Sequence, residues 1–343
     1  MNLRWLRCFF FVLLLCLLLV PPLAPQQAAP PAEIRVIPLG IFDAQDNPLP
    51  DITADQLRIR GVEAEWKLAP ALGPRKVVLL LDVTSSMSSY GNWERAEAFA
   101  TSFISLLDSD VELALHTYGE FTQERSPFTL HHQSILAAVQ AGRGPNSQPL
   151  SPKRDYLASL FKGLVGAAEP QLDFGDAIVL VAHSVGPHPL GPVDSFDTLA
   201  RELSSRGIRL FCIAVGEPYT QLMMGRYPPV IYRTVPFLPS LIVQLVAATG
   251  GSRYHYIQHR ANAVPGLGPQ FSEDDIPLVA RSVNALLKNC YRLELSLRKP
   301  LKKRTDLKIE VRDQRGKKRK DVVLLYPTVL YPLPPQSTVQ SNQ

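Results

Sequence analysis

The sequence predicts an α/β fold: a doubly wound, mostly parallel sheet with a small accessory β module beside it. From residue 76 onward, near-continuous apolar segments alternate with stretches whose apolar residues recur at intervals of three and four. Buried strands between amphipathic helices are typical of a parallel sheet covered on both faces. Segments before residue 70 and after residue 290 alternate every second residue instead, which predicts half-buried antiparallel strands. A chain of 343 residues that is 46% hydrophobic is long enough to bury a sizeable core.

The first 32 residues have the pattern of an export signal. Arg4 and Arg7 precede an apolar run from Cys8 to Val20, and proline and alanine follow. This run is shorter than the ~20 residues of a typical membrane span. We therefore expect residues 1–32 to be a signal peptide or an uncleaved N-terminal anchor. Either reading predicts an exported protein, periplasmic or extracellular, and the anchor would add membrane association through the N-terminus.

Two cysteines remain beyond this segment, Cys212 and Cys290. Export allows a disulfide between them. Cys212, however, lies in the apolar strand pattern of residues 208–216, where a buried free thiol is the commoner state. We therefore favour two free thiols and keep the disulfide as the alternative.

Residues 33–70 predict three strands. Residues 34–44 alternate as a strand should, Asp46, Asn47 and Pro48 supply a turn, and two shorter strands follow on either side of Gly61. This piece is too small to fold alone. We expect it to pack with strands at the other end of the chain.

Residues 71–289 predict the α/β domain. Strands are expected at 76–82, 111–118, 176–183 and 208–216, and helices at 92–109, 151–169, 194–207 and 274–290. A long loop is expected at 217–236, followed by a helix and a strand up to residue 257. In such sheets the binding crevice lies beyond the carboxyl ends of the strands.

Residues 290–331 predict a small antiparallel meander that packs with residues 33–70, and residues 332–343 predict a disordered tail. The turns of the meander are rich in lysine and arginine: residues 298–321 carry twelve basic and four acidic side chains, a local net charge of +8 in a chain of +5. The remainder therefore has a net charge of −3, so the basic character is local. We expect no nucleic-acid partner, because an exported protein with few interleaved aromatic residues lacks the usual footprint.

The first predicted core strand ends in a cluster of oxygen-bearing side chains. Asp82, Thr84 and Ser86 alternate along the turn that follows "VVLLL". Hard divalent cations bind oxygen ligands, and Mg²⁺ takes only a few from the protein. Short polar side chains also satisfy backbone donors in tight turns without any metal. The spacing alone leaves both readings open, and we expect the turn to face outward.

At this loop the chain resembles a von Willebrand factor type A domain, and more narrowly the exported bacterial proteins with the acidobacterial version of it. The resemblance extends to "DITADQLRIRGVEAEW", "GIRLFCIAVG", "LVAATGGSRY" and "YRLELSL". It implies a metal-ion-dependent adhesion site with the pattern Asp-x-Ser-x-Ser. Thr84 and Ser86 then stand for the two hydroxyl ligands, and Asp82 for the aspartate that acts mostly through water.

The second half of that site departs from the family pattern. An aspartate expected after the next central strand is replaced at the matching positions Ala182, His183 and Ser184. An imidazole is a poor ligand for Mg²⁺. Ser151 is the nearest hydroxyl for the remaining threonine of the family, although it also suits an ordinary helix N-cap before Pro152. We therefore expect a degenerate site that binds Mg²⁺ or Mn²⁺ weakly or not at all.

A secreted serine hydrolase is the alternative function. Ser184 follows a strand, as the nucleophile of α/β-hydrolases does. Its base would be His255 or His259, and its acid Asp194 or Asp197. Pro187 and Pro189 oppose this reading, because they obstruct the helix that should begin directly after the nucleophile.

The favoured function is a non-enzymatic binding module for a protein or cell-envelope ligand. We expect contacts at the strand ends near Asp82 and in the predicted long loop. That loop presents side chains that recur at interfaces, namely Met223, Met224, Tyr227 and Tyr232. The sequence indicates neither the identity of the ligand nor the oligomeric state.

Overall fold

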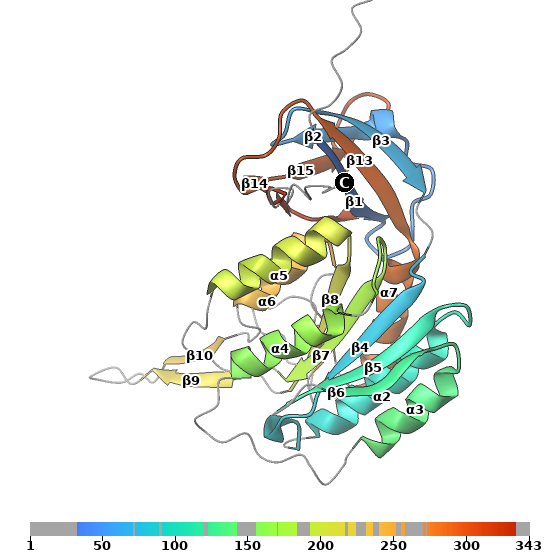
Figure 1. The fold of residues 1–343 in the computed structure, drawn as a ribbon, viewed down its shortest axis with the longest axis vertical. Coiled ribbons are helices and arrows are strands. Elements are labelled where there is room, and N and C mark those ends of the chain that lie inside the picture. Colours follow the sequence, from blue (N-terminus) through green and yellow to red (C-terminus); the bar gives the residue numbers. More distant parts are fainter. Residues whose placement is uncertain are drawn as a thin grey trace, which may run out of the picture.

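The computed structural model describes residues 33–70, 73–88, 91–119, 123–142, 156–169, 171–183, 193–216, 219–223, 231–235, 240–251, 255–257, 270–271 and 273–333. These residues form an α/β domain and a β module, seen in Figure 1 at the bottom and the top of the molecule. The predicted signal segment and most of the predicted tail lie outside the described residues. Within the described residues, no helix has the length and apolar character needed to cross a membrane.

The α/β domain is built on a seven-stranded sheet in the order β12-β11-β8-β7-β4-β5-β6. Its strands are β4 (Lys76–Asp82), β5 (Glu112–Tyr118), β6 (Gln123–Thr129), β7 (Ala177–His183), β8 (Arg209–Val215), β11 (His255–Ile257) and β12 (Gln270–Phe271). All neighbours are parallel except β5 and β6. The predicted mostly parallel sheet is therefore confirmed.

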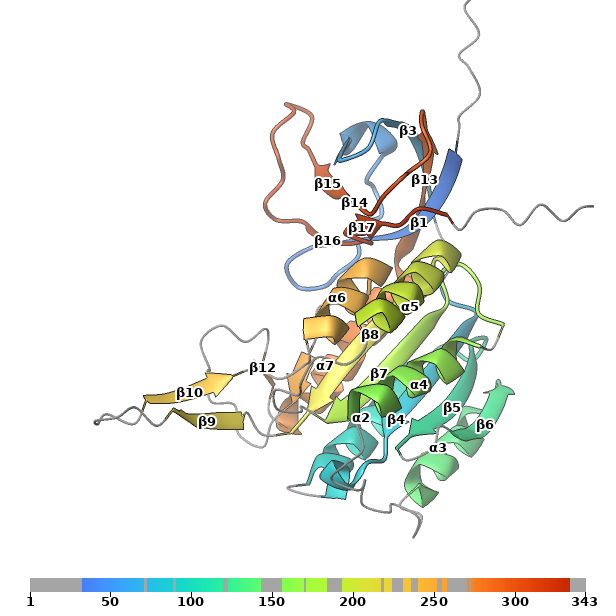
Figure 2. The same ribbon diagram turned by 60° about the vertical axis from the view of Figure 1, so that its left-hand side comes forward.

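Helices cover both faces of this sheet (Figures 1 and 2). One face packs against α2 (Asn92–Leu106), α3 (His132–Ala141) and α7 (Ile276–Lys288), and the other against α4 (Tyr156–Ala168), α5 (Val193–Arg206) and α6 (Ser240–Thr249). Successive strand residues point to opposite faces, so Leu79 belongs to the first core and Leu80 to the second. Burial on both faces explains why the sequence of β4 is apolar without alternation.

The β module combines strands from both ends of the described chain. Its strands are β1 (Glu33–Phe42), β2 (Leu57–Arg60), β3 (Ala64–Pro70), β13 (Cys290–Leu297), β14 (Thr305–Asp306), β15 (Lys308–Val311), β16 (Val323–Leu325) and β17 (Val329–Leu330). They form a sheet in the order β16-β1-β13-β3 and the pairs β15-β2 and β14-β17. The accessory module predicted from both ends of the chain is therefore present.

The predicted C-terminal meander is wrong. The strands β13, β15 and β16 do not pair with one another: β13 lies between β1 and β3, β15 pairs with β2, and β16 pairs with β1. Each of these three strands is thus paired with an N-terminal strand, and apolar residues of both segments share a single core. Neither segment could bury that core alone.

Two further features of the α/β domain differ from the prediction. The segment expected to be a long loop contains the hairpin β9 (Tyr219–Met223) and β10 (Ile231–Val235). This hairpin projects from the body of the domain in Figures 1 and 2. The edge strand β6 and helix α3 were not predicted. For β6 the reason is its mostly exposed, mixed sequence, which gives no clear alternation.

Cys212 and Cys290 are both free and buried. Cys212 belongs to the core beneath α4, α5 and α6, whereas Cys290 begins β13. The preference for free thiols over a disulfide is therefore confirmed.

The β module lies at the end of the sheet where the parallel strands begin. In Figure 1 the arrowhead of β4 points away from the module, toward the opposite edge. A buried arginine, Arg209 at the start of β8, holds the beginning of the sheet to helix α7 by donating to the carbonyls of Leu286 (2.9 Å) and Leu287 (2.6 Å). The carboxyl ends of the strands are therefore left free of the module.

Candidate functional site

Asp82 lies at the carboxyl end of β4, between β5 and β7. Its side chain is fully buried. One carboxylate oxygen accepts the backbone N–H of Thr84 at 2.8 Å, and the other accepts the backbone N–H of His183 at 3.1 Å. Asp82 therefore ties the turn after β4 to the end of β7.

Thr84 and Ser86 come together above this carboxylate. Their hydroxyl oxygens, Thr84 Oγ1 and Ser86 Oγ, are 2.7 Å apart, so one donates a hydrogen bond to the other. The short 3₁₀ turn Ser85–Ser88 creates this approach, and the N–H of Met87 donates to the carbonyl of Thr84 at 3.0 Å. The two hydroxyls thus meet in the same turn whose backbone the Asp82 carboxylate holds.

The turn is less open than we expected. Asp82 and Thr84 are buried, Ser85 and Ser86 are half-buried, and Ser88 is exposed. The outward-facing part of the turn is therefore Ser85 to Ser88. The expectation that Asp82 itself faces outward is wrong, because its hydrogen bonds hold it beneath the turn.

Helix α2 adds two residues that the sequence reasoning missed. Asn92 donates from Nδ2 to the carbonyl of Ser86 at 3.0 Å, and Arg95 donates from Nη1 to Oδ1 of Asn92 at 2.9 Å. Arg95 is only 3% exposed. Its position among the inward-facing residues of an amphipathic helix was the available signal, since a charge on such a face is rarely buried without a partner.

His183 ends β7, where its backbone N–H donates to the carboxylate of Asp82. Its pKa lies below the ordinary value, mainly because the imidazole is buried. The negative charge of Asp82 opposes this lowering and the positive charge of Arg95 adds to it. The site therefore holds a neutral imidazole at neutral pH, near a buried guanidinium.

These groups fit a divalent cation only in part. Two hydroxyl oxygens and one carboxylate match the preference of Mg²⁺ and Mn²⁺ for oxygen. Both oxygens of Asp82 already accept backbone N–H groups, and Arg95 contributes a positive charge nearby. Among the described residues, no cluster of three or more histidine, cysteine, aspartate or glutamate side chains could hold a metal. The described oxygen donors therefore supply only part of the coordination that such a cation takes.

Several predicted site residues lie outside the described residues or are described by backbone alone. Ser151, Ser184 and His259 belong to the first group, and Asp194 and His255 to the second. Asp197 is described: its carboxylate lies 3.8 Å from the guanidinium of Arg304 in the β module. This candidate acid is therefore engaged with the module rather than with the end of β7.

Two of the predicted partner-binding residues, Met223 and Tyr232, belong to the β9–β10 hairpin. Met223 ends β9 opposite Ile231, and Tyr232 of β10 lies opposite Leu222. Met224 and Tyr227 lie outside the described residues. Because β8 leads into this hairpin, the hairpin leaves the sheet at the same edge as Asp82.

The α/β domain matches a known family by sequence. Residues 76–226 match the model of the von Willebrand factor type A domain. No curated protein matches by sequence. Among solved structures, the conserved hypothetical protein BatB from Bacteroides thetaiotaomicron is 16% identical and has a TM-score of 0.41, and the match covers 62% of this chain and 99% of that one. A von Willebrand factor type A protein from Catenulispora acidiphila is 11% identical and has a TM-score of 0.42, with 90% of this chain and 76% of that one covered. The manganese-loaded TRAP protein of Plasmodium vivax is 13% identical and has a TM-score of 0.39, with 77% of this chain and 97% of that one covered.

Proposed function

We propose that this chain, which carries a von Willebrand factor type A domain over residues 76–226, is an exported, non-enzymatic binding protein. Such domains are generally interaction modules. The ligand, a protein or another component of the cell envelope, binds at the carboxyl edge of the sheet. Contacts come from the turn Ser85–Ser88 and from the β9–β10 hairpin, and a tightly held cation is not required.

The observation that carries this proposal is the convergence of Asp82, Thr84 and Ser86 at the end of β4. We interpret the 2.7 Å contact between the two hydroxyls, together with the buried carboxylate of Asp82, as one half of a degenerate cation site. The other half has an imidazole, His183, where the family has a carboxylate. The buried guanidinium of Arg95 supplies positive charge to the same network.

The position of the edge supports binding. Loops and hairpins held by a rigid sheet are the usual carriers of binding residues. The β module lies at the opposite end of the sheet (Figure 1), so it leaves this edge accessible to a large ligand. The apolar and basic features of residues 1–32 support export.

Site-specific photo-crosslinking tests this proposal. A photoreactive amino acid replaces exposed Ser88 in the full chain, and irradiation of cells that produce the protein should give a discrete higher-mass product. The matched control replaces exposed Asp110, which precedes β5 at the other edge of the sheet. Equal crosslinking from both positions, or none from Ser88, would contradict a binding face at the carboxyl edge.

A second assay separates binding from hydrolysis. A fluorophosphonate probe labels activated serine nucleophiles, so we expect no label on the folded full-length protein. Label that is lost in Ser184→Ala would overturn the non-enzymatic assignment and favour the hydrolase.

A further inference from the structure

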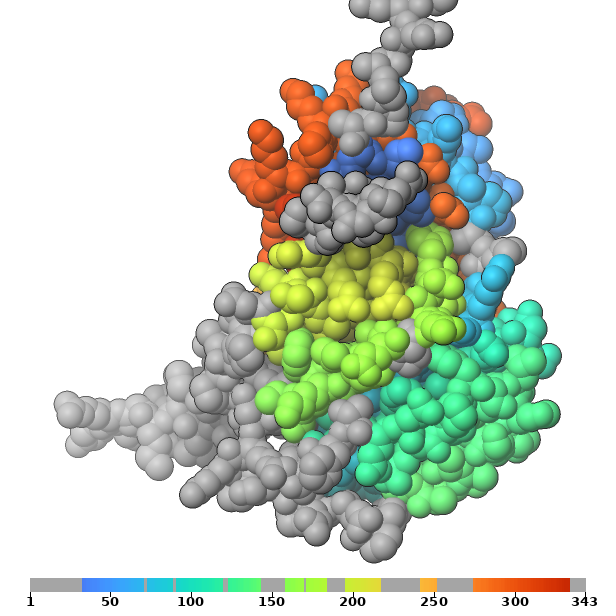
Figure 3. Space-filling model, in the orientation of Figure 1, coloured from blue at the N-terminus to red at the C-terminus, as the bar shows by residue number. Residues whose placement is uncertain are grey.

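A groove between the β module and helix α5 is lined by four arginine side chains. The groove has a volume of about 250 Å³, and Arg35, Arg201, Arg206 and Arg292 are among its lining residues. None of the described residues that line it is acidic. Figures 1 and 2 show α5 lying beside β1 of the module, and Figure 3 shows the module and the α/β domain as space-filling atoms in the same orientation as Figure 1. The groove lies toward the end of the α/β domain where the parallel strands begin, opposite to Asp82, so it is independent of the proposed function.

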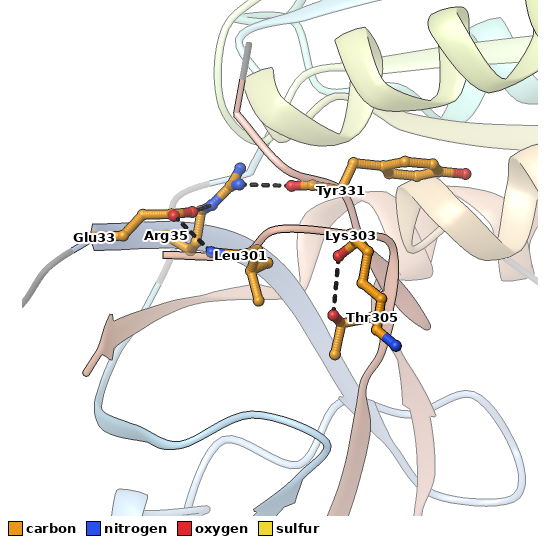
Figure 4. Close-up of polar contacts among 6 residues, drawn as sticks. All are labelled: Glu33, Arg35, Leu301, Lys303, Thr305 and Tyr331. Carbon is orange, nitrogen blue, oxygen red and sulfur yellow. Dashed lines mark hydrogen bonds and ion pairs between the residues drawn. The ribbon is translucent and has the colours of Figure 1, made fainter. Parts of the chain in front are cut away.

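Arg35 has a structural role in the groove, because its guanidinium is already paired. Its side chain extends from β1 and forms an ion pair with Glu33, and Nη2 donates to the carbonyl of Tyr331 at 2.5 Å (Figure 4). Glu33 also accepts the backbone N–H of Leu301 at 3.1 Å. The charge of Arg35 is therefore neutralised by Glu33, and the bonds fix β1 against the segment after β17.

Arg206 of α5 also has a structural role. It donates to the carbonyls of Ala168 at 3.0 Å and Leu172 at 2.7 Å, and Glu202 lies 3.5 Å away. These contacts hold the end of α5 to the end of α4. Its charge is partly balanced by Glu202.

Arg201 and Arg292 have no such balance. Neither lies within ion-pair distance of a carboxylate from the described part of the chain. Arg292 instead stacks over the ring of Phe174, with 5.6 Å between guanidinium carbon and ring centroid. Stacking leaves the edge of a guanidinium free to donate hydrogen bonds. The groove therefore carries an excess of about two positive charges.

The remaining lining groups also suit an anion. Ser204 of α5, a buried residue, also lines the groove. Burial raises the pKa of the Tyr331 phenol; the positive charges of Arg304 and, to a smaller extent, Arg201 lower it, and Asp197 raises it. Guanidinium and hydroxyl donors thus converge from α5 and β13 on one small volume.

We propose that this groove binds a phosphate group, presented as free phosphate or as a small soluble phosphate monoester. A phosphate monoester carries a charge near −2 and three acceptor oxygens, which match two uncompensated guanidinium groups and a hydroxyl. A single carboxylate would leave one guanidinium unbalanced. The volume of about 250 Å³ is below the ~300–1,000 Å³ of most sites for drug-sized ligands, which favours a compact anion.

Titration of the full-length protein with inorganic phosphate tests the proposal. Isothermal calorimetry at constant ionic strength should give saturable binding of one phosphate, and acetate should bind at least about tenfold more weakly. Arg201→Ala should weaken phosphate binding by about tenfold, the effect of losing one hydrogen bond to a charged group. Arg201 is exposed, so this variant should keep the fold, and circular dichroism checks that it does.

The matched control is Arg298→Ala, which removes the same charge outside the groove. Its side chain is 70% exposed, and its nearest carboxylate, Glu65, is 4.0 Å away. We expect wild-type affinity for this variant. No saturable phosphate binding, or equal weakening by the two substitutions, would overturn the proposal.

A second titration with glycerol phosphate distinguishes the two sources. Tighter binding than inorganic phosphate assigns the groove to an organic monoester, and weaker binding assigns it to free phosphate. Arg292→Ala serves as an independent variant, with the same expected loss for both probes.

Discussion

Replacing Asp82 tests directly whether this carboxylate holds the strand-end turn together. Asp82→Ala removes both carboxylate oxygens, whereas Asp82→Asn keeps one acceptor oxygen and replaces the other by an amide N–H₂. In the wild type, the two oxygens accept the N–H groups of Thr84 at 2.8 Å and His183 at 3.1 Å. The alanine variant therefore loses both acceptors and the asparagine variant only one.

The size of the effect follows from these two bonds. A buried donor left without an acceptor costs about 1–3 kcal/mol. Asp82→Ala should therefore lower the free energy of unfolding by about 2–6 kcal/mol, and Asp82→Asn by about half as much. A domain of this size loses ~2–4 °C in Tm for each kcal/mol, so the alanine variant should melt about 4–24 °C lower.

The assay is urea unfolding followed by circular dichroism, with EDTA present so that bound cations make no contribution. Asp110→Ala is the control, because Asp110 is exposed at the other edge of the sheet and its loss should change stability by less than about 0.5 kcal/mol. Stability of both Asp82 variants within that margin would refute the structural role. Equal losses of unfolding free energy in Asp82→Ala and Asp82→Asn would refute the claim that the first loses two hydrogen bonds and the second only one.

Four further outcomes follow from the structure. Arg209→Met should destabilise the protein by about 3 kcal/mol or more in urea unfolding, since it leaves three carbonyls at the start of the sheet without their buried donor; an unchanged midpoint would contradict this. Burial lowers the pKa of His116 in the folded protein, so its contribution to stability is complete above pH ~6.5 and is lost as the pH falls below that value. His116→Gln should therefore reduce the loss of unfolding free energy at low pH. An identical pH profile of stability in the variant would exclude this contribution. Burial raises the pKa of the thiols of Cys212 and Cys290, so iodoacetamide at pH 8 should modify neither until denaturant is added. Addition of 1 mM Mn²⁺ should raise the Tm by less than about 2 °C, whereas micromolar affinity would give ~4 kcal/mol and a far larger shift.

The core strands were predictable because strands that are buried on both faces consist almost entirely of apolar residues. Each of β4, β7 and β8 is apolar along its length, since helices cover both of its faces. The strand β6 was missed because it lies at an edge and is mostly exposed. Pairing in the β module was also beyond sequence reasoning: β13 alternates as predicted, yet alternation does not tell which strand lies beside it.

The candidate site was predictable in its first half only. The alternation of Asp82, Thr84 and Ser86 predicts that their oxygen atoms lie close together, and in the structure the hydroxyl oxygens of Thr84 and Ser86 are 2.7 Å apart. The contribution of Arg95 depends on how helix α2 is rotated toward the strand end, which sequence spacing does not determine. Likewise, the arginine groove joins residues of β1, α5 and β13 that only the tertiary structure brings together.

The measurement that tests the account most directly is the Ser88 crosslink in envelope fractions washed with EDTA, compared with the same fractions given 1 mM Mn²⁺. If the strand-end face binds its ligand without a tightly held cation, the yield of crosslinked product should be the same under both conditions. A product that disappears with the chelator and returns with Mn²⁺ would contradict the account, because binding would then depend on a metal at Asp82, Thr84 and Ser86.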